Sequence, residues 1–379
     1  MIVAITYFSS VKLHVLFKKT ILITGARAPI ALELSRSFAM AGHRVIMADS
    51  QHFTVARWSN SVFKYIIFPS PAFRTAAFVN KLKNIISEFQ VDHLIPTCEE
   101  AFYISAHLDE LNCRVWTSPI ELMNQLHNKS SFISIAAGHF NVPQTINCDE
   151  FTDWNNCTNY VFKKIYSRFG TSVIIDAEKD VYQVLKNNTK GWIAQQRITG
   201  KEVCVYSIWE QGRMKAFACY HPLLRYGKGA GIFFEPVFND KIMHSVVSFG
   251  EAISYNGQLS FDIIIKDEMP YVIECNPRGT SGAHLLNKSL CKAFLGTDLH
   301  FPVTDKTFCI GYAMLLKYPE LIFSKKVKKA NDVIFAKHDP APFFLQTLSL
   351  LEIFYLKLIK KQTVLQVTTG DIEWNGPTN

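Results

Sequence analysis

The sequence lacks the features that mark a disulfide-rich, zinc-binding or nucleic-acid-binding protein. Its nine cysteines include no C-x-x-C pair, which argues against a zinc site and, with the odd count, against a disulfide framework. We therefore expect reduced thiols and a cytoplasmic protein. The formal net charge is +8, but no block of five or six like charges is present, so we predict no nucleic-acid-binding arm. Internal repeats and low-complexity runs are also absent.

Glycine is scarce where a dinucleotide site would need it. The segment "TILITGARAPIALELSRSFAMAGHRVIMADS", which starts at Thr20, predicts a strand, a helix and a second strand, hence a βαβ unit. Asp49 follows Gly25 at about the distance expected for a ribose-binding acid. The second and third glycines of the G-x-G-x-x-G fingerprint are replaced, however, by Arg27 and Ile30. We interpret this unit as a Rossmann-like layer without a dinucleotide, which leaves a nicotinamide oxidoreductase as a weak alternative.

Neither of the two most apolar segments is predicted to cross a membrane. The first residues, "MIVAITYFSSVKLHVLFKK", are interrupted by Lys12 and His14 before membrane-spanning length, and we treat residues 1–19 as an N-terminal extension. Near the other end, "PFFLQTLSLLEIFYLKLIKK" is helical in pattern and strongly apolar, and it closes with lysines. Such a helix can lie on a membrane surface, but we expect it to be a docked terminal helix.

Acidic residues follow a further buried strand of the N-terminal region. In "VDHLIPTCEEAF" the strand over 91–96 delivers Glu99 and Glu100 into a loop at its carboxyl end, the edge where open α/β sheets bind ligands. The two acids are therefore candidates for substrate binding, and acids at a helix start are the alternative. The pattern changes near residue 118, where we place the end of a domain that covers 20–118.

Two acids interrupt strand-forming residues in "SFDIIIKDEMPYVIECNPRGTSG", Ser260 to Gly282. The two apolar runs predict a hairpin around the five-residue connection "KDEMP". With Ile265 paired to Tyr271, Asp262 stands directly opposite Glu274, and Asn276 follows on the same face. Carboxylates facing each other with β-carbons about 5 Å apart repel. The hairpin therefore predicts a positive charge between them.

The order of these segments, from the βαβ unit to the hairpin, resembles that of the ATP-grasp superfamily, which includes carbamoyl phosphate synthetase, biotin carboxylase and many carboxylate-amine ligases. The most specific element is "ECNPR", which matches the superfamily's acid-x-Asn-Pro-Arg signature. The resemblance covers about residues 20–300. It implies an α/β protein with a Rossmann-like pre-ATP-grasp domain and then a two-part α+β ATP-grasp domain over 119–300, with its lid at about 155–200. We expect residues 301–379 to form a C-terminal helical extension.

The resemblance also implies site residues. Asp262, Glu274 and Asn276 occupy the positions that hold magnesium on the ATP phosphates, and Arg278 occupies that of a phosphate-binding arginine, with a structural ion pair as its alternative. Lys163, in "VFKKIYSRFGTSV", aligns with a phosphate-contacting lysine that precedes a flexible glycine loop, although Lys164 stands where proline is usual.

The weaker matches come from three further segments. Lys129 matches a basic residue near the phosphates, with a solvated helix lysine as its alternative. Backbone groups near Gln196 and Ile198 would read the adenine, and Glu202 would accept from the ribose hydroxyls. Arg225 and Lys228, among glycines in "HPLLRYGKGAG", are candidates for an acyl phosphate or a substrate carboxylate, unless they belong to a surface turn.

The implied activity is an ATP-dependent and Mg²⁺- or Mn²⁺-dependent ligation. A substrate carboxylate becomes an acyl phosphate and is attacked by an amine or a similar nucleophile, with Lys163 and Arg278 as catalytic cations. The partners would be small-molecule carboxylates and amines, and relatives are often homodimers. A non-catalytic ATP-binding module and a biotin-type carboxylase remain alternatives.

Overall fold

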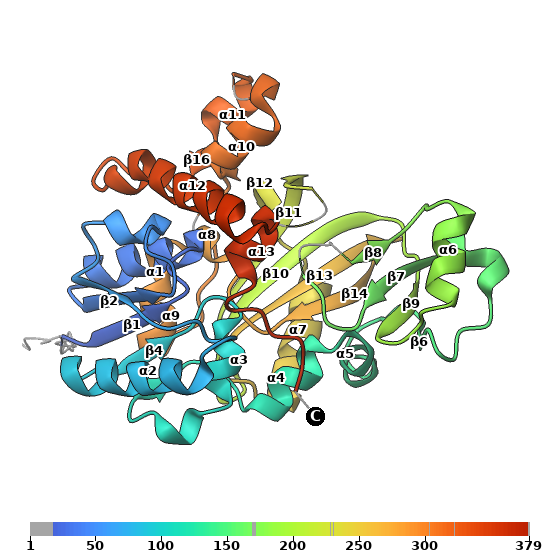
Figure 1. Cartoon of the computed structure of the whole chain (residues 1–379), viewed down its shortest axis with the longest axis horizontal. Helices are drawn as coiled ribbons and strands as arrows, with labels where there is room; N and C mark the ends of the chain where they lie inside the picture. The colour runs from blue at the N-terminus through green and yellow to red at the C-terminus, as the bar shows by residue number, and fades with distance from the viewer. Residues whose placement is uncertain are drawn as a thin grey trace, which may run out of the picture.

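The computed structural model describes residues 18–168, 172–227, 229, 231–302, 304–321 and 323–377. Nearly all of the predicted N-terminal extension, 1–19, therefore lies outside the described residues. The chain forms three sheets arranged side by side, with the N-terminal parallel sheet at one end, a long twisted sheet in the middle and a small sheet at the other end (Figure 1). The C-terminal helices cross over the first of these sheets.

The N-terminal sheet has the predicted Rossmann-like topology. Its five strands are all parallel and lie in the order β3-β2-β1-β4-β5. β1 is buried at every position, as expected for a parallel strand that is covered on both faces. The elements are β1 (Thr20–Thr24), α1 (Pro29–Met40), β2 (Arg44–Asp49), η1 (Val55–Trp58), β3 (Lys64–Ile67), α2 (Thr75–Phe89), β4 (His93–Ile95), α3 (Glu100–Ser105), η2 (Leu108–Glu110) and β5 (Arg114–Val115).

The central sheet is antiparallel over its first six strands and carries the predicted hairpin at one edge. Its order is β14-β13-β10-β11-β12-β15-β16. One face packs on α4, α5 and α7, and the other packs on α8, α9 and α1, so that α1 belongs to the cores of both large sheets. The elements are α4 (Ile120–His127), α5 (Lys129–Ala136), β10 (Lys201–Glu210), β11 (Arg213–Arg225), β12 (Gly231–Val237), α7 (Asp240–Ala252), β13 (Gly257–Lys266), β14 (Met269–Asn276), α8 (Ala283–Leu286) and α9 (Ser289–Leu295).

The C-terminal region is more than the helical extension expected from the sequence. β15 (Phe308–Cys309) and β16 (Asn331–Asp332) add two strands to the central sheet. Each strand is two residues long, too short for any periodicity to show in the sequence. The remaining elements are α10 (Gly311–Lys317), η4 (Pro319–Leu321), α11 (Lys325–Lys329), α12 (Ala341–Lys360) and α13 (Val364–Thr369).

The small sheet covers most of the segment that is predicted as the lid. Its order is β6-β9-β7-β8, and an aromatic cluster, in which Phe162 contacts Phe151, Trp154 and Tyr182, fills its core. This sheet begins at β6, before the start near residue 155 that we predict for the lid, and Gly170 of the predicted lid loop lies outside the described residues. The elements are β6 (Thr145–Asn147), η3 (Trp154–Asn159), β7 (Tyr160–Lys164), β8 (Val173–Ile174), α6 (Lys179–Lys186) and β9 (Trp192–Gln196).

A buried histidine in the parallel sheet predicts loss of stability in acid. Nδ1 of His93 accepts a hydrogen bond from the Trp116 indole at 3.2 Å, and burial, with the field of Arg114, lowers the pKa of His93 from 6.5 to about 4. The unfolded chain therefore binds this proton at higher pH than the native chain. The free energy of unfolding should fall from about pH 6.5 towards pH 4, by up to roughly 1 kcal/mol per pH unit.

Urea unfolding measured over that pH range tests this assignment. His93→Gln should flatten the slope of the unfolding free energy against pH. His244→Gln, which changes an exposed histidine of α7, should leave the slope unchanged. Equal slopes in the wild type and His93→Gln would mean that other groups cause the acid loss.

Candidate functional site

The hairpin brings Asp262 and Glu274 opposite each other, as predicted, but its turn and the register next to the turn differ from the prediction. The connection is a two-residue turn, Asp267 and Glu268, both at positive φ (49° and 60°), rather than the five residues expected. This alone would shift the register by one. A β-bulge between Asp262 and Ile263, which leaves Ile273 as the extra residue, restores the pairing of Asp262 with Glu274. The predicted pair is therefore confirmed, whereas the predicted pairing of Ile265 with Tyr271 is wrong.

Two lysines supply positive charge beside this pair. Nζ of Lys129, at the start of α5, lies 3.4 Å from Oε1 of Glu274, and the lysine side chain is buried. Burial by itself would raise the pKa of Glu274, but the fields of Lys129 and Lys163 outweigh it and lower that pKa. For Asp262, burial and the neighbouring charge of Glu274 raise the pKa. The lysines thus compensate the glutamate and leave the aspartate with unfavourable negative charge.

The "ECNPR" segment places an amide and a guanidinium next to the acids. Nδ2 of Asn276 lies 3.4 Å from Oδ2 of Asp262, and Nη2 of Arg278 donates to Oδ1 of Asn276 at 3.1 Å. Asn276 and Glu274 share a face because side chains alternate along β14. Cys275, on the opposite face, is buried in the core, and burial raises the pKa of its thiol well above the ordinary value.

Of the two candidate lysines on β7, Lys163 faces the site. Its side chain is buried, its Nζ donates to Oε1 of Gln195 at 2.8 Å, and burial lowers its pKa. Lys164 is exposed and lies over the Trp192 ring, 5.9 Å from its centroid. The strand alternation therefore selects Lys163 as the lysine near Glu274.

Glu202 and Arg225, predicted separately for ribose and substrate binding, form an ion pair. Nε of Arg225 donates to Oε2 of Glu202 at 3.0 Å, and Nη2 donates to Oε1 at 2.5 Å. The charge of Arg225 also opposes the rise in the pKa of Asp262. The second residue predicted from that loop, Lys228, lies outside the described residues.

The predicted adenine-reading segment follows β9. The side chain of Gln196 is exposed, and its backbone N–H donates to the Gln144 carbonyl at 2.7 Å. Ile198 is half-buried in the connection to β10. A Cβ built on Gly200 would stand 2.1 Å from the Ile265 carbonyl oxygen, so only glycine fits this close approach to β13.

The C-terminal tail crosses over the site at Glu99, a contact that the sequence analysis missed. Nε of Arg168 donates to Oε1 of Glu99 at 2.9 Å, and the backbone N–H of Trp374 donates to Oε2 at 3.0 Å. The Trp374 indole stacks on Phe102 and donates to Asn124. The only sequence signal is the ending "DIEWNG", which joins acids to a large aromatic residue. Glu99 therefore binds the chain's own tail and an arginine that precedes the lid loop.

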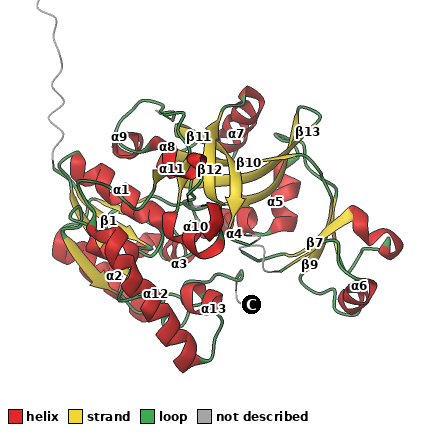
Figure 2. Ribbon diagram, turned by 90° about the horizontal axis from the view of Figure 1, so that it is seen from above, coloured by secondary structure: helices red, strands yellow, loops and turns green. Residues whose placement is uncertain are grey.

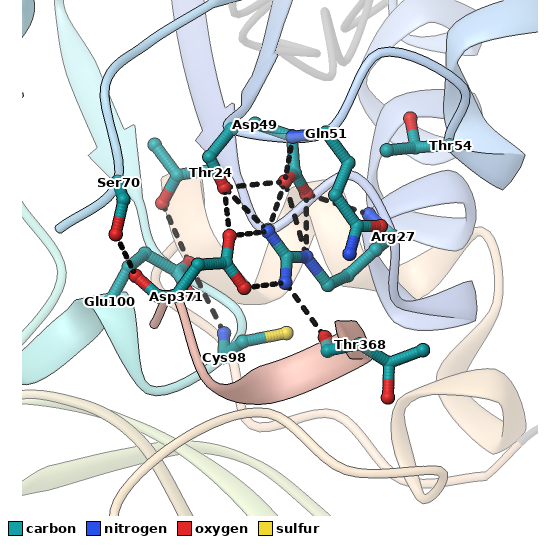
Figure 3. A network of polar contacts seen from close by, with 12 residues as sticks. Thr24, Arg27, Asp49, Gln51, Thr54, Ser70, Cys98, Glu100, Thr368 and Asp371 are labelled. Atoms are coloured by element: carbon teal, nitrogen blue, oxygen red, sulfur yellow. Dashed lines mark hydrogen bonds and ion pairs between the residues drawn. The ribbon is translucent and has the colours of Figure 1, made fainter. Parts of the chain in front are cut away.

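The same tail reaches the carboxyl ends of β1 and β2 (Figure 3). Arg27, which replaces the second fingerprint glycine, donates to Asp49 through its backbone N–H at 3.0 Å and pairs with both Asp49 and Asp371 through its guanidinium. Ser50 and Ser70 also hydrogen-bond to Asp371. Asp49, which stands at the spacing expected for a ribose-binding acid, is thus paired with Arg27. The tail covers the edge of the sheet where α/β proteins bind ligands.

Glu100 lies inside the loop that follows β4. Its Oε1 accepts from Thr24 Oγ1 at 2.8 Å and from the backbone N–H groups of Thr97 and Cys98. Burial raises the pKa of this carboxyl, and the side chain has no exposed surface. We therefore omit Glu100 from the substrate site and assign it to the loop's structure.

Comparisons with known proteins agree with this arrangement. Residues 126–282 match the family profile described as the ATP-grasp domain. No curated protein sequence gives a significant match. Among solved structures, N5-carboxyaminoimidazole synthetase from Staphylococcus aureus is similar with a TM-score of 0.62 and 16% identity, over 81% of this chain and 86% of that one.

Two other solved structures share the fold. L-amino acid ligase from Bacillus licheniformis is similar with a TM-score of 0.55 and 18% identity, over 72% of this chain and 70% of that one. Biotin carboxylase from Campylobacter jejuni, solved as a β-γ-ATP complex, is similar with a TM-score of 0.57 and 15% identity, over 74% of this chain and 72% of that one. Residues 126–282 therefore match the ATP-grasp domain family, and the chain shares its fold with these solved enzymes.

Proposed function

We propose that the protein is an ATP- and Mg²⁺-dependent ligase that activates a substrate carboxylate as an acyl phosphate for attack by an amine or a similar nucleophile. The observation that supports this most is the apposition of Asp262 and Glu274 across the hairpin, with Lys129, Lys163 and Arg278 around them. Mn²⁺ could replace Mg²⁺ in the same oxygen ligands.

The donor set fits a hard divalent cation. Two carboxylates and one amide, from Asp262, Glu274 and Asn276, meet at one face of the hairpin. Within the described residues no three His, Cys, Asp or Glu side chains gather as they would in a closed protein cage. Magnesium keeps waters and phosphate oxygens in its coordination shell and needs few protein ligands. Bound there, it would neutralise the excess negative charge at Asp262 and the charge that develops on the phosphates.

The cations of the chain act on the nucleotide's phosphates. Lys163 and Lys129 are buried, so their charges act through little water and are held in position before the reaction. Arg278, oriented by Asn276, presents the planar donor fork that suits a phosphoryl group. Since charge builds up on phosphoryl oxygens during transfer, these groups stabilise the transition state without a covalent nucleophile.

Residues outside the acid pair are our candidates for binding the nucleoside and the substrates. Glu202, Gln196 and Ile198 stay our candidates for the nucleoside, and Glu99, Arg225 and Lys228 for the carboxylate and the nucleophile. The name of one similar protein, L-amino acid ligase, favours a C–N bond as the product. A cytoplasmic location and a homodimer remain part of this proposal.

An ADP-release assay with ATP and Mg²⁺ tests the proposal. The chain is presented with a panel of carboxylates, amino acids included, each with and without candidate amines. Release that requires both a carboxylate and an amine supports the ligase. Release that instead requires bicarbonate would identify a carboxylase, and binding of ATP without release across the panel would identify a nucleotide-binding module.

A further inference from the structure

Helix α12 (Ala341–Lys360) is apolar over most of its surface and leaves one apolar side exposed. Six of its large apolar residues are more than half exposed, and we call them the α12 stripe: Phe344, Leu351, Phe354, Tyr355, Leu358 and Ile359. At 100° per residue they fall within one side of the helix. The helix is docked on the N-terminal domain as expected, with Phe343 packed against the core, but this second apolar side stays exposed.

The inward side of α12 is anchored by polar contacts. The carboxylate of Glu352 accepts from the backbone N–H groups of His52 and Phe53, at 3.2 and 2.7 Å, just before η1. Gln346 and the hydroxyl of Ser349 are also buried. A surface helix of a soluble protein normally presents polar residues to the solvent. The α12 stripe is therefore a contiguous apolar surface on one helix, of the kind that marks an interaction site.

The charges around the α12 stripe are positive. Lys357 and Lys360 lie in the last turn and Lys361 caps the helix, whereas the only acid of α12 is Glu352, which points inward. Figure 1 shows α10, α11 and α12 together along the upper edge of the molecule, and α11 adds four further lysines. Figure 2, seen from above, also shows α12 lying along the outside of the N-terminal domain.

We propose that the α12 stripe docks the protein on an anionic membrane surface. A helix that lies in the interface buries its apolar side among the acyl chains and places lysines at the headgroups. A second copy of this chain fits less well, because an isologous contact would bring lysine-rich helix ends together without a carboxylate on the exposed side of α12 to pair with them.

A membrane-spanning arrangement fits less well too. Within the described residues α12 is the one helix with the length and hydropathy to cross a bilayer. Crossing would separate Glu352 from His52 and Phe53 and place a carboxylate in hydrocarbon, which is costly. The contacts that hold α12 flat on the N-terminal domain are compatible only with a helix lying parallel to the surface.

Flotation of the full-length protein with lipid vesicles tests the proposal. Vesicles of mixed phosphatidylcholine and phosphatidylglycerol should bind the protein, with less binding to phosphatidylcholine alone and at high salt. Replacing Lys357, Lys360 and Lys361 together by glutamine should weaken binding to the anionic vesicles by roughly a hundredfold. Leu351→Glu/Leu358→Glu should weaken binding to both vesicle types, by at least about tenfold.

The matched control is Phe73→Glu, which changes a side chain of the N-terminal domain that is 72% exposed, close to the 76% of Leu358. It should bind vesicles like the wild type, and circular dichroism should show all variants folded. Absence of binding to anionic vesicles, or equal binding by the stripe variant, would overturn the proposal. So would resistance to alkaline extraction, which would indicate a spanning helix, or a dimer without lipid that the stripe variant abolishes.

Discussion

Glu274→Gln is expected to abolish ATP turnover and leave the fold intact. The amide keeps the size of the side chain and removes the charge on which Lys129 and Lys163 act, so the proposed cation loses one of its two carboxylates. Loss of one preorganised electrostatic group typically lowers kcat by about 10² to 10³. The measurement is ADP release under the conditions in which the wild type is active, with thermal unfolding as the test of folding.

Glu268→Gln is the matched control for this experiment. Glu268 lies on the same hairpin, in its exposed turn, so the substitution changes the same net charge without touching the acid pair. The control should retain wild-type turnover. Near-normal turnover in Glu274→Gln would rule out the assignment of the cation to this hairpin, and a parallel loss in the control would indicate a general effect of charge.

Arg27→Met is expected to destabilise the protein by about 3–5 kcal/mol, the usual result of removing one partner from a buried ion pair. The side chains of Arg27, Asp49 and Asp371 are 11%, 1% and 19% exposed. Without the guanidinium, two carboxylates would face each other without compensation. Chemical denaturation monitored by fluorescence measures the change, and limited proteolysis should show earlier cleavage in the tail over 364–377.

Arg197→Met is the matched control because it removes a similar contact at the surface. Arg197 donates to both oxygens of Asp176 at 2.6 and 2.9 Å, but the two side chains are 32% and 58% exposed. An exposed pair contributes only about 0–1 kcal/mol. If both variants lost the same stability, burial would not be the reason for the strength of the Arg27 cluster.

The hairpin shows how far local sequence carries a structural prediction. Alternation along two neighbouring strands was enough to place Asn276 beside Glu274 and Cys275 in the core. The turn type and the bulge at Ile273 were not foreseen. The shorter turn and the bulge each shift the register by one residue in opposite directions. The predicted pairing of Asp262 with Glu274 is therefore correct, although the predicted pairing nearer the turn is wrong.

The tail shows the opposite case. Arg27 and Asp371 are 344 positions apart, and no local pattern relates them. Glu99 lies at the end of a strand, as predicted, but the sequence offered no reason to expect Arg168 and Trp374 as its partners. Arg225 and Glu202 were likewise assigned to different ligands and turned out to contact each other.

The sequence by itself determined the βαβ unit and the acids of the hairpin, because these depend on strand alternation and on motifs within a few residues. Alternation also predicted that only one of Lys163 and Lys164 could face the site, and the structure decided that it is Lys163. Only the tertiary structure decided where the tail crosses the N-terminal domain, that β15 and β16 join the central sheet, and which side of α12 faces the solvent. Those features depend on contacts between distant segments, whose free energy comes from burial and ion pairing after the chain has closed long loops.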